Sequence, residues 1–216
     1  MSKKNDAKHA AKSKILKAAR EAFSDRGYEA ATLKVIGDLC DAKRTLIMYH
    51  FNSKEELWQQ VILAVKNEHQ AAFNRYYSEG APKTDHDKAK QCGIAFLKAS
   101  REVPEYGRIL IREGLTASER LRWINEALTP EQIAMPVFDD PDYTEAAFLG
   151  LVRQIQAGSM LYLANMSPLM AVEGSAFGEY PVIPLSDEAI DKTVEYMLVL
   201  VELRLKEIKA ARAIAC

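Results

Sequence analysis

Apolar residues recur every three or four positions along most of the chain, and this spacing predicts helices. The segment 143–166 is typical, because Phe148, Leu151, Val152 and Ile155 fall on one face of a helix. Glycine and proline separate such segments, and no stretch alternates as a half-buried strand does. The predicted helices cover residues 13–26, 32–40, 43–49, 54–77, 86–101, 104–114, 118–128, 130–135, 143–166 and 187–211. The expected fold class is therefore all-α.

The first three predicted helices form a recognisable unit. Gly27 follows the helix 13–26 at the place where a left-handed C′ residue is expected. Residues 32–51 then have the length and pattern of a helix-turn-helix, with Thr32 as N-cap and Asp41 in the turn. A short helix that protrudes from a small bundle fits the DNA major groove, which is roughly 12 Å wide. The chain is therefore expected to hold an N-terminal three-helix helix-turn-helix domain and a C-terminal helical bundle.

The recognition helix and the helix after it are expected to be anchored in different ways. In the recognition helix, Ile47 lies on the inner face, with Leu46 or Phe51 beside it. The next helix begins at a capping box, in which Ser53 is the N-cap and Glu56 reaches back to the Ser53 amide. This pattern predicts a long, well-capped helix after the helix-turn-helix.

Charge is divided unevenly along the chain. Residues 1–60 hold 12 Lys and Arg against 8 Asp and Glu, whereas the remainder holds 17 against 22. A basic N-terminal segment followed by an acidic remainder suits a protein in which only the N-terminal segment contacts phosphate. A chance fluctuation would give the same numbers. The charge distribution is thus compatible with DNA binding but does not establish it.

Composition points to a globular protein without a cofactor. Hydrophobic residues make up 48% and charged residues 27%, which allows a sizeable core. No apolar run is long enough to span a membrane, and the polar N-terminus is no secretory signal. Cys40, Cys92 and Cys216 make no disulfide framework, and no histidine stands at metal-ligand spacing from them. We expect no metal, no cofactor, no membrane association and a cytoplasmic location.

A family resemblance extends over about 45 residues of the head. The residues that match the family's sequence pattern align with it without a gap. They are Thr32, Ile36, His50, Phe51, Lys54, Glu55 and Leu57, preceded by Ala18, Phe23, Gly27 and Tyr28. This segment resembles the N-terminal domain of the TetR family of bacterial transcriptional regulators. Asp41, Lys43, Thr45 and Met48 depart from the residues usual in that family, and Tyr49 stands one position after the usual tyrosine.

The resemblance implies a function and a division of the chain. It implies a ligand-responsive transcriptional regulator, most often a repressor, that binds a palindromic operator on double-stranded DNA as a homodimer. Residues 1–52 would be the DNA-binding domain, and residues 53–216 the ligand-sensing and dimerisation domain. The dimer would form through the helices 143–166 and 187–211 of each copy.

Several side chains are candidates for DNA contact. Arg44 is the best base reader, because arginine forks onto guanine O6 and N7, but a solvated surface arginine is the alternative. Thr32 and Lys54 stand at helix starts, where a phosphate would explain them, and His50 either donates to phosphate or caps its helix. The full set is Thr32, Lys34, Lys43, Arg44, Thr45, Tyr49, His50 and Lys54. The lysines at positions 3, 4, 8, 12 and 14 form a basic arm that either touches phosphates or is a disordered terminus.

The body offers weaker signals for a small-molecule effector. Aromatic and sulfur-containing side chains with one polar anchor would line an apolar pocket, although ordinary core packing explains each of them singly. The candidates are Phe96, Tyr106, Trp123, Phe138, Gln154, Tyr162 and Met166. No nucleophile–base pattern or glycine-rich phosphate loop supports an enzyme. The competing hypothesis is a helical ligand carrier or protein-interaction bundle that does not bind DNA.

Overall fold

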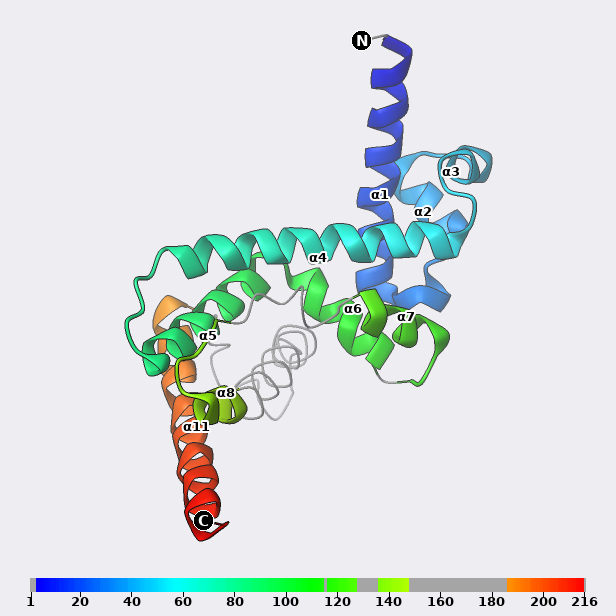
Figure 1. Cartoon of the computed structure of the whole chain (residues 1–216). Coiled ribbons are helices and arrows are strands. Elements are labelled where there is room, and N and C mark those ends of the chain that lie inside the picture. Colours follow the sequence, from blue (N-terminus) through cyan, green and yellow to red (C-terminus); the bar gives the residue numbers. More distant parts are fainter. Residues whose placement is uncertain (1–2, 115, 128–135, 148–185, 216) are drawn as a thin grey trace, which may run out of the picture. The chain divides into compact units, whose positions relative to one another are not determined.

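The structure is a computed structural model that describes residues 3–114, 116–127, 136–147 and 186–215 of the 216-residue chain. Its helices are α1 (Lys3–Ala30), α2 (Leu33–Cys40), α3 (Arg44–His50), α4 (Lys54–Ser78), α5 (Asp85–Glu102), α6 (Pro104–Gly114), α7 (Glu119–Ala127), α8 (Pro141–Ala147) and α11 (Asp187–Ala215) (Figure 1). The described ranges contain no strand, and the predicted all-α fold is confirmed. None of these helices is both long enough and apolar enough to cross a membrane.

The chain divides into two compact units. Unit 1 comprises residues 1–68 and 108–127, and unit 2 comprises residues 69–107 and 128–216. Helices α4 and α6 each contribute residues to both units. The functional boundary at residue 52 that the sequence suggests remains a prediction, because compactness alone does not show which residues bind DNA.

The start of unit 1 is a long helix on which α2 and α3 pack. Ile15 and Phe23 of α1, Ile36 of α2 and Ile47 of α3 are each at most 1% exposed, so the three helices share one core. Helix α1 begins at Lys3, not near residue 13 as predicted. The first turns carry no apolar stripe, and good helix formers such as alanine and lysine extend the helix without one.

Two local features of unit 1 can be compared with their predictions. Gly27 has a positive φ of 76°, as expected for the glycine that follows the first helix, but its ψ of 170° is extended, not left-handed helical. At the start of α4, Ser53 Oγ accepts from the Glu56 amide at 2.9 Å, as predicted. The predicted return contact is wrong, because Glu56 Oε2 accepts from the backbone and side-chain amides of Asn52, at 3.2 and 2.7 Å.

Residues 108–127 complete unit 1. Arg112 of α6 donates to the carbonyl oxygens of Ser24 and Asp25, at 3.0 and 2.8 Å, near the end of the regular part of α1. Trp58 of α4 is fully buried, and its ring lies 5.5 Å from that of Trp123 in α7. The helix-turn-helix is therefore packed into a larger unit than its own three helices.

Unit 2 is built around α5, α8 and α11. Ile190, Val194, Leu198 and Val201 lie on one side of α11, are at most 2% exposed and share a core with Leu97 of α5. Figure 1 shows α5 and α8 beside α11; α5 pairs with its first half through Arg101 and Asp187, and α8 with its second half through Asp142 and Arg212. The predicted helix 130–135, the loop 167–185 and most of the predicted helix 143–166 lie outside the described residues.

Candidate nucleic-acid interface

Backbone geometry fixes the turn between α2 and α3. Thr32 Oγ1 accepts from the Val35 amide at 3.2 Å, which confirms Thr32 as the N-cap of α2. Asp41 follows α2 in the left-handed conformation, with φ 49° and ψ 47°, and its amide donates to the Gly37 carbonyl. The Ala42 amide donates to the same oxygen at 2.9 Å. Both amides that follow α2 are therefore satisfied, and the chain turns sharply into α3.

Gly37 permits this turn, and the sequence analysis missed it. A Cβ built on Gly37 would lie 2.4 Å from the Ala42 carbonyl oxygen, far inside van der Waals contact. The available signal was its position, since glycine inside a helix costs roughly 1 kcal/mol relative to alanine and therefore suggests a close approach. Gly37 thus sets how near the turn lies to α2.

Helix α3 presents one polar face and one anchored face. Ile47 and Phe51 are fully buried, whereas Leu46 is 39% exposed, so Phe51 is the partner of Ile47 that the sequence left open. Exposed side chains on α3 are Arg44, Thr45 and Tyr49, and Tyr49 is 68% exposed. Met48 is half-buried. The buried pair holds the helix while its other side stays open.

Five of the eight DNA-contact candidates line one groove between α2, α3 and the start of α4: Thr32, Lys34, Lys43, Arg44 and Lys54. Asp38 and Asp41 line it as well. Within the described residues, Lys34, Lys43 and Arg44 make no ion pair, and the four cations of the groove outnumber its two carboxylates. Thr45, Tyr49 and His50 lie on α3 but do not line this groove.

Lys54 is held by contacts inside unit 1. Its Nζ lies 4.2 Å from the centre of the Tyr28 ring and donates to the Glu29 carbonyl oxygen at 3.4 Å. The Arg120 guanidinium carbon lies 4.0 Å from the same ring centre. Burial lowers the pKa of Lys54, and burial together with a hydrogen bond to Glu55 raises the pKa of Tyr28 to about 12. Lys54 therefore has a structural partner whether or not a phosphate is present.

His50 lies at the end of α3 in a positive environment. Its side chain is half-buried, and its Nδ1 is buried without a hydrogen-bond partner in the described part of the chain. Burial lowers the pKa of His50, and the nearby charges of Lys8 and Lys12 lower it further. The imidazole is therefore neutral at pH 7, so it would act on a phosphate as a hydrogen-bond donor and not as a cation.

Of the candidate effector residues that the structure describes, Phe96, Tyr106 and Phe138 belong to unit 2, and Trp123 belongs to unit 1. Phe96 and Tyr106 both contact the buried His69 ring in unit 2, at 5.3 and 4.2 Å between ring centres. Phe138 packs in the unit 2 core, whereas Trp123 belongs to unit 1. Gln154, Tyr162 and Met166 lie outside the described residues. The effector pocket therefore remains a prediction.

Comparison with known proteins shows which of them the sequence of this chain resembles. Residues 15–61 match the family model for bacterial regulatory proteins of the tetR family. The chain is 29% identical over 119 residues to the HTH-type transcriptional regulator RutR of Escherichia coli, a match that covers 55% of each protein. It is 42% identical over 52 residues to the regulator UidR of the same organism, covering 24% of this chain and 26% of UidR. The chain thus spans at most about half the length of the curated relatives it matches.

Solved structures extend the likeness to the whole fold. A TetR-like transcriptional regulator from Rhodococcus aligns with a TM-score of 0.58 at 17% identity, over 87% of this chain and 92% of that one. A TetR family transcription regulator from Marinobacter aquaeolei aligns with a TM-score of 0.57 at 16% identity, over 93% and 98%. At this identity the likeness concerns the fold alone. Residues 15–61 are therefore a domain of the tetR family of bacterial regulatory proteins, and the chain as a whole shares the fold of these TetR-like structures.

Proposed function

We propose that this chain is a ligand-responsive transcriptional repressor that binds a palindromic operator as a homodimer. The observation that carries the proposal is the unpaired positive charge of Lys34, Lys43 and Arg44 beside one groove of the helix-turn-helix. Charges that the protein leaves unneutralised on a protruding helix are suited to a polyanion. The buried Ile47 and Phe51 give α3 the rigidity that base recognition needs.

Each candidate has a distinct role in this proposal. Arg44, in the first turn of α3, forks onto a guanine in the major groove. Lys34, Lys43 and Thr32 bind phosphates at the groove edge and fix the register of the protein on the duplex. Lys54 adds a phosphate contact that its stacking on Tyr28 holds in place. Sequence specificity therefore rests chiefly on Arg44, with Thr45 and Tyr49 as further contacts.

The homodimer rests on the second apolar face of α11. Five apolar residues on this helix are between 43% and 87% exposed: Tyr196, Val199, Leu200, Leu203 and Ile214. Their spacing puts them on one stripe, opposite the stripe that packs in the unit 2 core. A second copy of the same helix would cover this stripe across a two-fold axis. Two heads would then meet successive major grooves, roughly 34 Å apart.

Control by an effector requires that the ligand prefers the state that does not bind DNA. Helices α4 and α6 contribute residues to both compact units, so a change in unit 2 has a covalent route to the helix-turn-helix. An apolar small molecule suits the aromatic candidates Phe96, Tyr106 and Phe138 of unit 2. The effector would then release the operator by shifting the population from the state that binds DNA to the state that does not.

The proposal is tested by selecting bound duplexes from a random pool and measuring their affinity by fluorescence anisotropy. Arg44→Ala is expected to cost about 1–3 kcal/mol on the selected site and to relax its specificity. Lys54→Ala should weaken all sequences alike and flatten the salt dependence. Thermal unfolding of each variant separates a binding loss from a folding loss, which matters because Lys54 contacts Tyr28.

Two results would count against the proposal. If the pool yields no sequence-selective, salt-sensitive binding, a ligand carrier or protein-interaction bundle becomes the better account. If a folded Arg44→Ala variant binds the selected site as tightly as the unchanged protein, α3 is not the reading element. Repeating the selection with cell metabolites present tests whether an effector weakens binding.

A further inference from the structure

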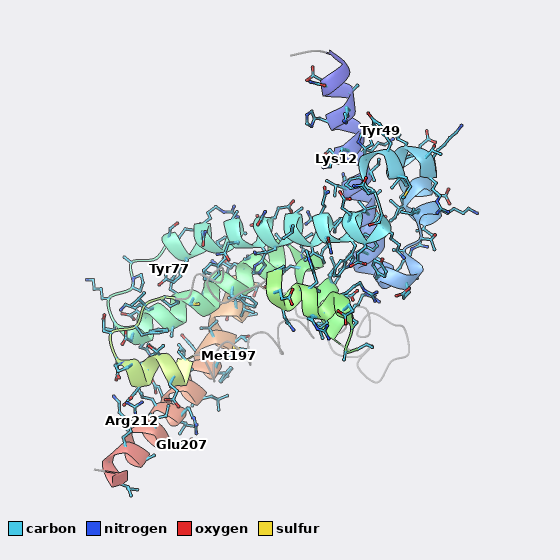
Figure 2. All side chains as sticks on the ribbon, turned by 45° about the vertical axis from the view of Figure 1, so that its right-hand side comes forward. Lys12, Tyr49, Tyr77, Met197, Glu207 and Arg212 are labelled. Atoms are coloured by element: carbon cyan, nitrogen blue, oxygen red, sulfur yellow. The ribbon has the colours of Figure 1, made fainter. Side chains whose placement is uncertain are left out.

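The first turns of α1 form a cationic cluster with the end of the recognition helix. Lys8 Nζ lies 5.3 Å from the centre of the Tyr49 ring, and Lys12 Nζ lies 5.4 Å from the centre of the Phe51 ring. The Tyr49 and His50 rings contact each other edge to face at 5.2 Å. We call Lys8, Lys12, Tyr49 and His50 the α1–α3 cluster. Figure 2 labels one residue from each helix of this cluster, Lys12 and Tyr49.

The α1–α3 cluster carries positive charge that nothing nearby neutralises. Lys8 and Lys12 make no ion pair within the described ranges, whereas other cations of unit 1 do: Arg108 pairs with Asp25, and Arg120 pairs with Glu113. Their charges also act on His50, whose pKa they help to lower. The fold thus brings two ammonium groups without an ion-pair partner in the described residues to the recognition helix, where an external anion would complement them.

Geometry identifies the kind of anion. Lys8 and Lys12 are four residues apart, so they share one face of α1 and lie about 6 Å apart along its axis. The phosphates of one DNA strand recur about every 3.4 Å along the duplex axis. Two lysines about 6 Å apart can therefore each contact a different phosphate of the same strand. Tyr49 belongs to the exposed face of α3 that is proposed to enter the major groove. The backbone bordering that groove is therefore the nearest polyanion to this cluster in a complex.

We infer that Lys8 and Lys12 on the N-terminal turns of α1 form a phosphate clamp, which grips the DNA backbone beside the recognition helix and is held in place by Tyr49 and Phe51. This inference rests on the proposed DNA binding and adds a second contact region, because neither lysine lines the groove of Lys34 and Arg44. The clamp contacts phosphates only, so it adds affinity and salt dependence but no sequence preference.

The test compares binding of the full chain to its selected duplex at several salt concentrations. Lys8→Ala/Lys12→Ala should weaken binding several-fold and reduce the slope of log K against log salt by about 3.6, because two phosphate contacts are lost in each copy of the dimer. Binding to unrelated duplexes should weaken by the same factor. Lys8→Arg/Lys12→Arg keeps both charges and should keep the slope of the unchanged protein.

A charge-matched control is Lys17→Ala/Lys83→Ala. Both lysines are exposed, and Lys17 points to the side of α1 opposite Lys8. This control should leave the slope unchanged. Far-ultraviolet circular dichroism checks that α1 stays helical in every variant, and Lys8→Gln/Lys12→Gln provides a second neutral pair if the alanine pair fails to fold.

The outcomes separate this inference from the proposed function. If the unchanged protein binds DNA and the folded neutral variant keeps its slope and affinity, the clamp does not exist although DNA binding stands. An equal loss in the Lys17→Ala/Lys83→Ala control also overturns the clamp, because the effect would then be one of net charge. If the unchanged protein binds no duplex at all, both proposals fail.

Discussion

At the scale of single residues, His69 is the buried ionisable side chain with the clearest energetic consequence. It is 6% exposed in unit 2, its Nε2 lies 3.1 Å from Ser100 Oγ, and its ring stacks on Tyr106 at 4.2 Å. Burial lowers the pKa of His69 from 6.5 to about 4. The folded chain therefore holds His69 neutral, whereas the unfolded chain protonates it below about pH 6.5.

We expect this difference to make unit 2 sensitive to acid. Between the unfolded pKa of 6.5 and the folded value of about 4, the unfolded state binds the extra proton, so stability falls as the pH falls through this window. The full effect is about 3 kcal/mol. Urea unfolding from about pH 7.5 to about pH 4.5 measures it.

The matched variant is His69→Gln, which keeps an amide to bond Ser100 but does not titrate in this range. It should be less stable than the unchanged protein at neutral pH, because the stack on Tyr106 is lost, yet its stability should fall less steeply towards acid. Equal pH slopes in the two proteins would show that His69 is not the source. Because both proteins share the other histidines and the carboxylates, the contribution of these groups to the pH dependence of stability cancels in the comparison.

At the scale of elements, the sequence predicts what depends on local spacing and misses what depends on contact. Apolar period, caps and turn residues place α2 to α6 within one or two residues of their observed bounds. The early start of α1 is not predicted, because its first turns have no apolar stripe, and the contacts of Lys8 and Lys12 with aromatic rings of the recognition helix region are not visible in the sequence. The candidate DNA residues follow from motif and charge, but their common groove depends on the turn at Gly37, which spacing does not reveal.

The close approach of α2 and its turn predicts a severe effect for a branched side chain at position 37. Gly37→Val should lower the free energy of unfolding by about 2–3 kcal/mol, because its Cβ meets a backbone oxygen that no rotamer change can move. DNA binding should fall with it, since the turn sets the position of α3. Thermal and urea unfolding of the full chain provide the measurement.

The control for this substitution is Asp38→Val, one position along the same helix at an exposed site. Valine and aspartate have nearly equal helix propensities, and valine is a better helix former than glycine, so Asp38→Val introduces valine without the clash and its effect on stability should stay within about 0.5 kcal/mol. A Gly37→Val protein as stable as Asp38→Val would mean that the turn can shift freely, contrary to the packing described here.

At the scale of the whole molecule, α11 is apolar on two opposite sides, and only one of them packs in a core formed by the described residues. The uncovered stripe of Tyr196, Val199, Leu200 and Leu203 is unusual for a surface helix, where single exposed apolar residues are normal but a continuous row marks an interaction site. The resemblance to the TetR family anticipated dimerisation through the last helices, and the exposed stripe supports it from packing alone.

Charges placed on this stripe should separate the two copies. Val199→Glu/Leu203→Glu is expected to convert a dimer into a folded monomer, and to weaken operator binding at least tenfold because each head then binds alone. Light scattering coupled to size exclusion measures the mass, and anisotropy measures the binding. The control Ala71→Glu/Asn74→Glu adds two charges at exposed positions of α4 and should leave the mass unchanged. A dimer that survives charges on the stripe would place its interface elsewhere.

The contact between Trp58 and Trp123 has a practical consequence. Both tryptophans of the chain, Trp58 and Trp123, belong to unit 1 and lie against each other there. Intrinsic tryptophan emission therefore reports on unit 1 and does not report on unit 2. Following emission and helical ellipticity in one melting experiment would reveal whether the two halves lose structure together or in succession, without any label.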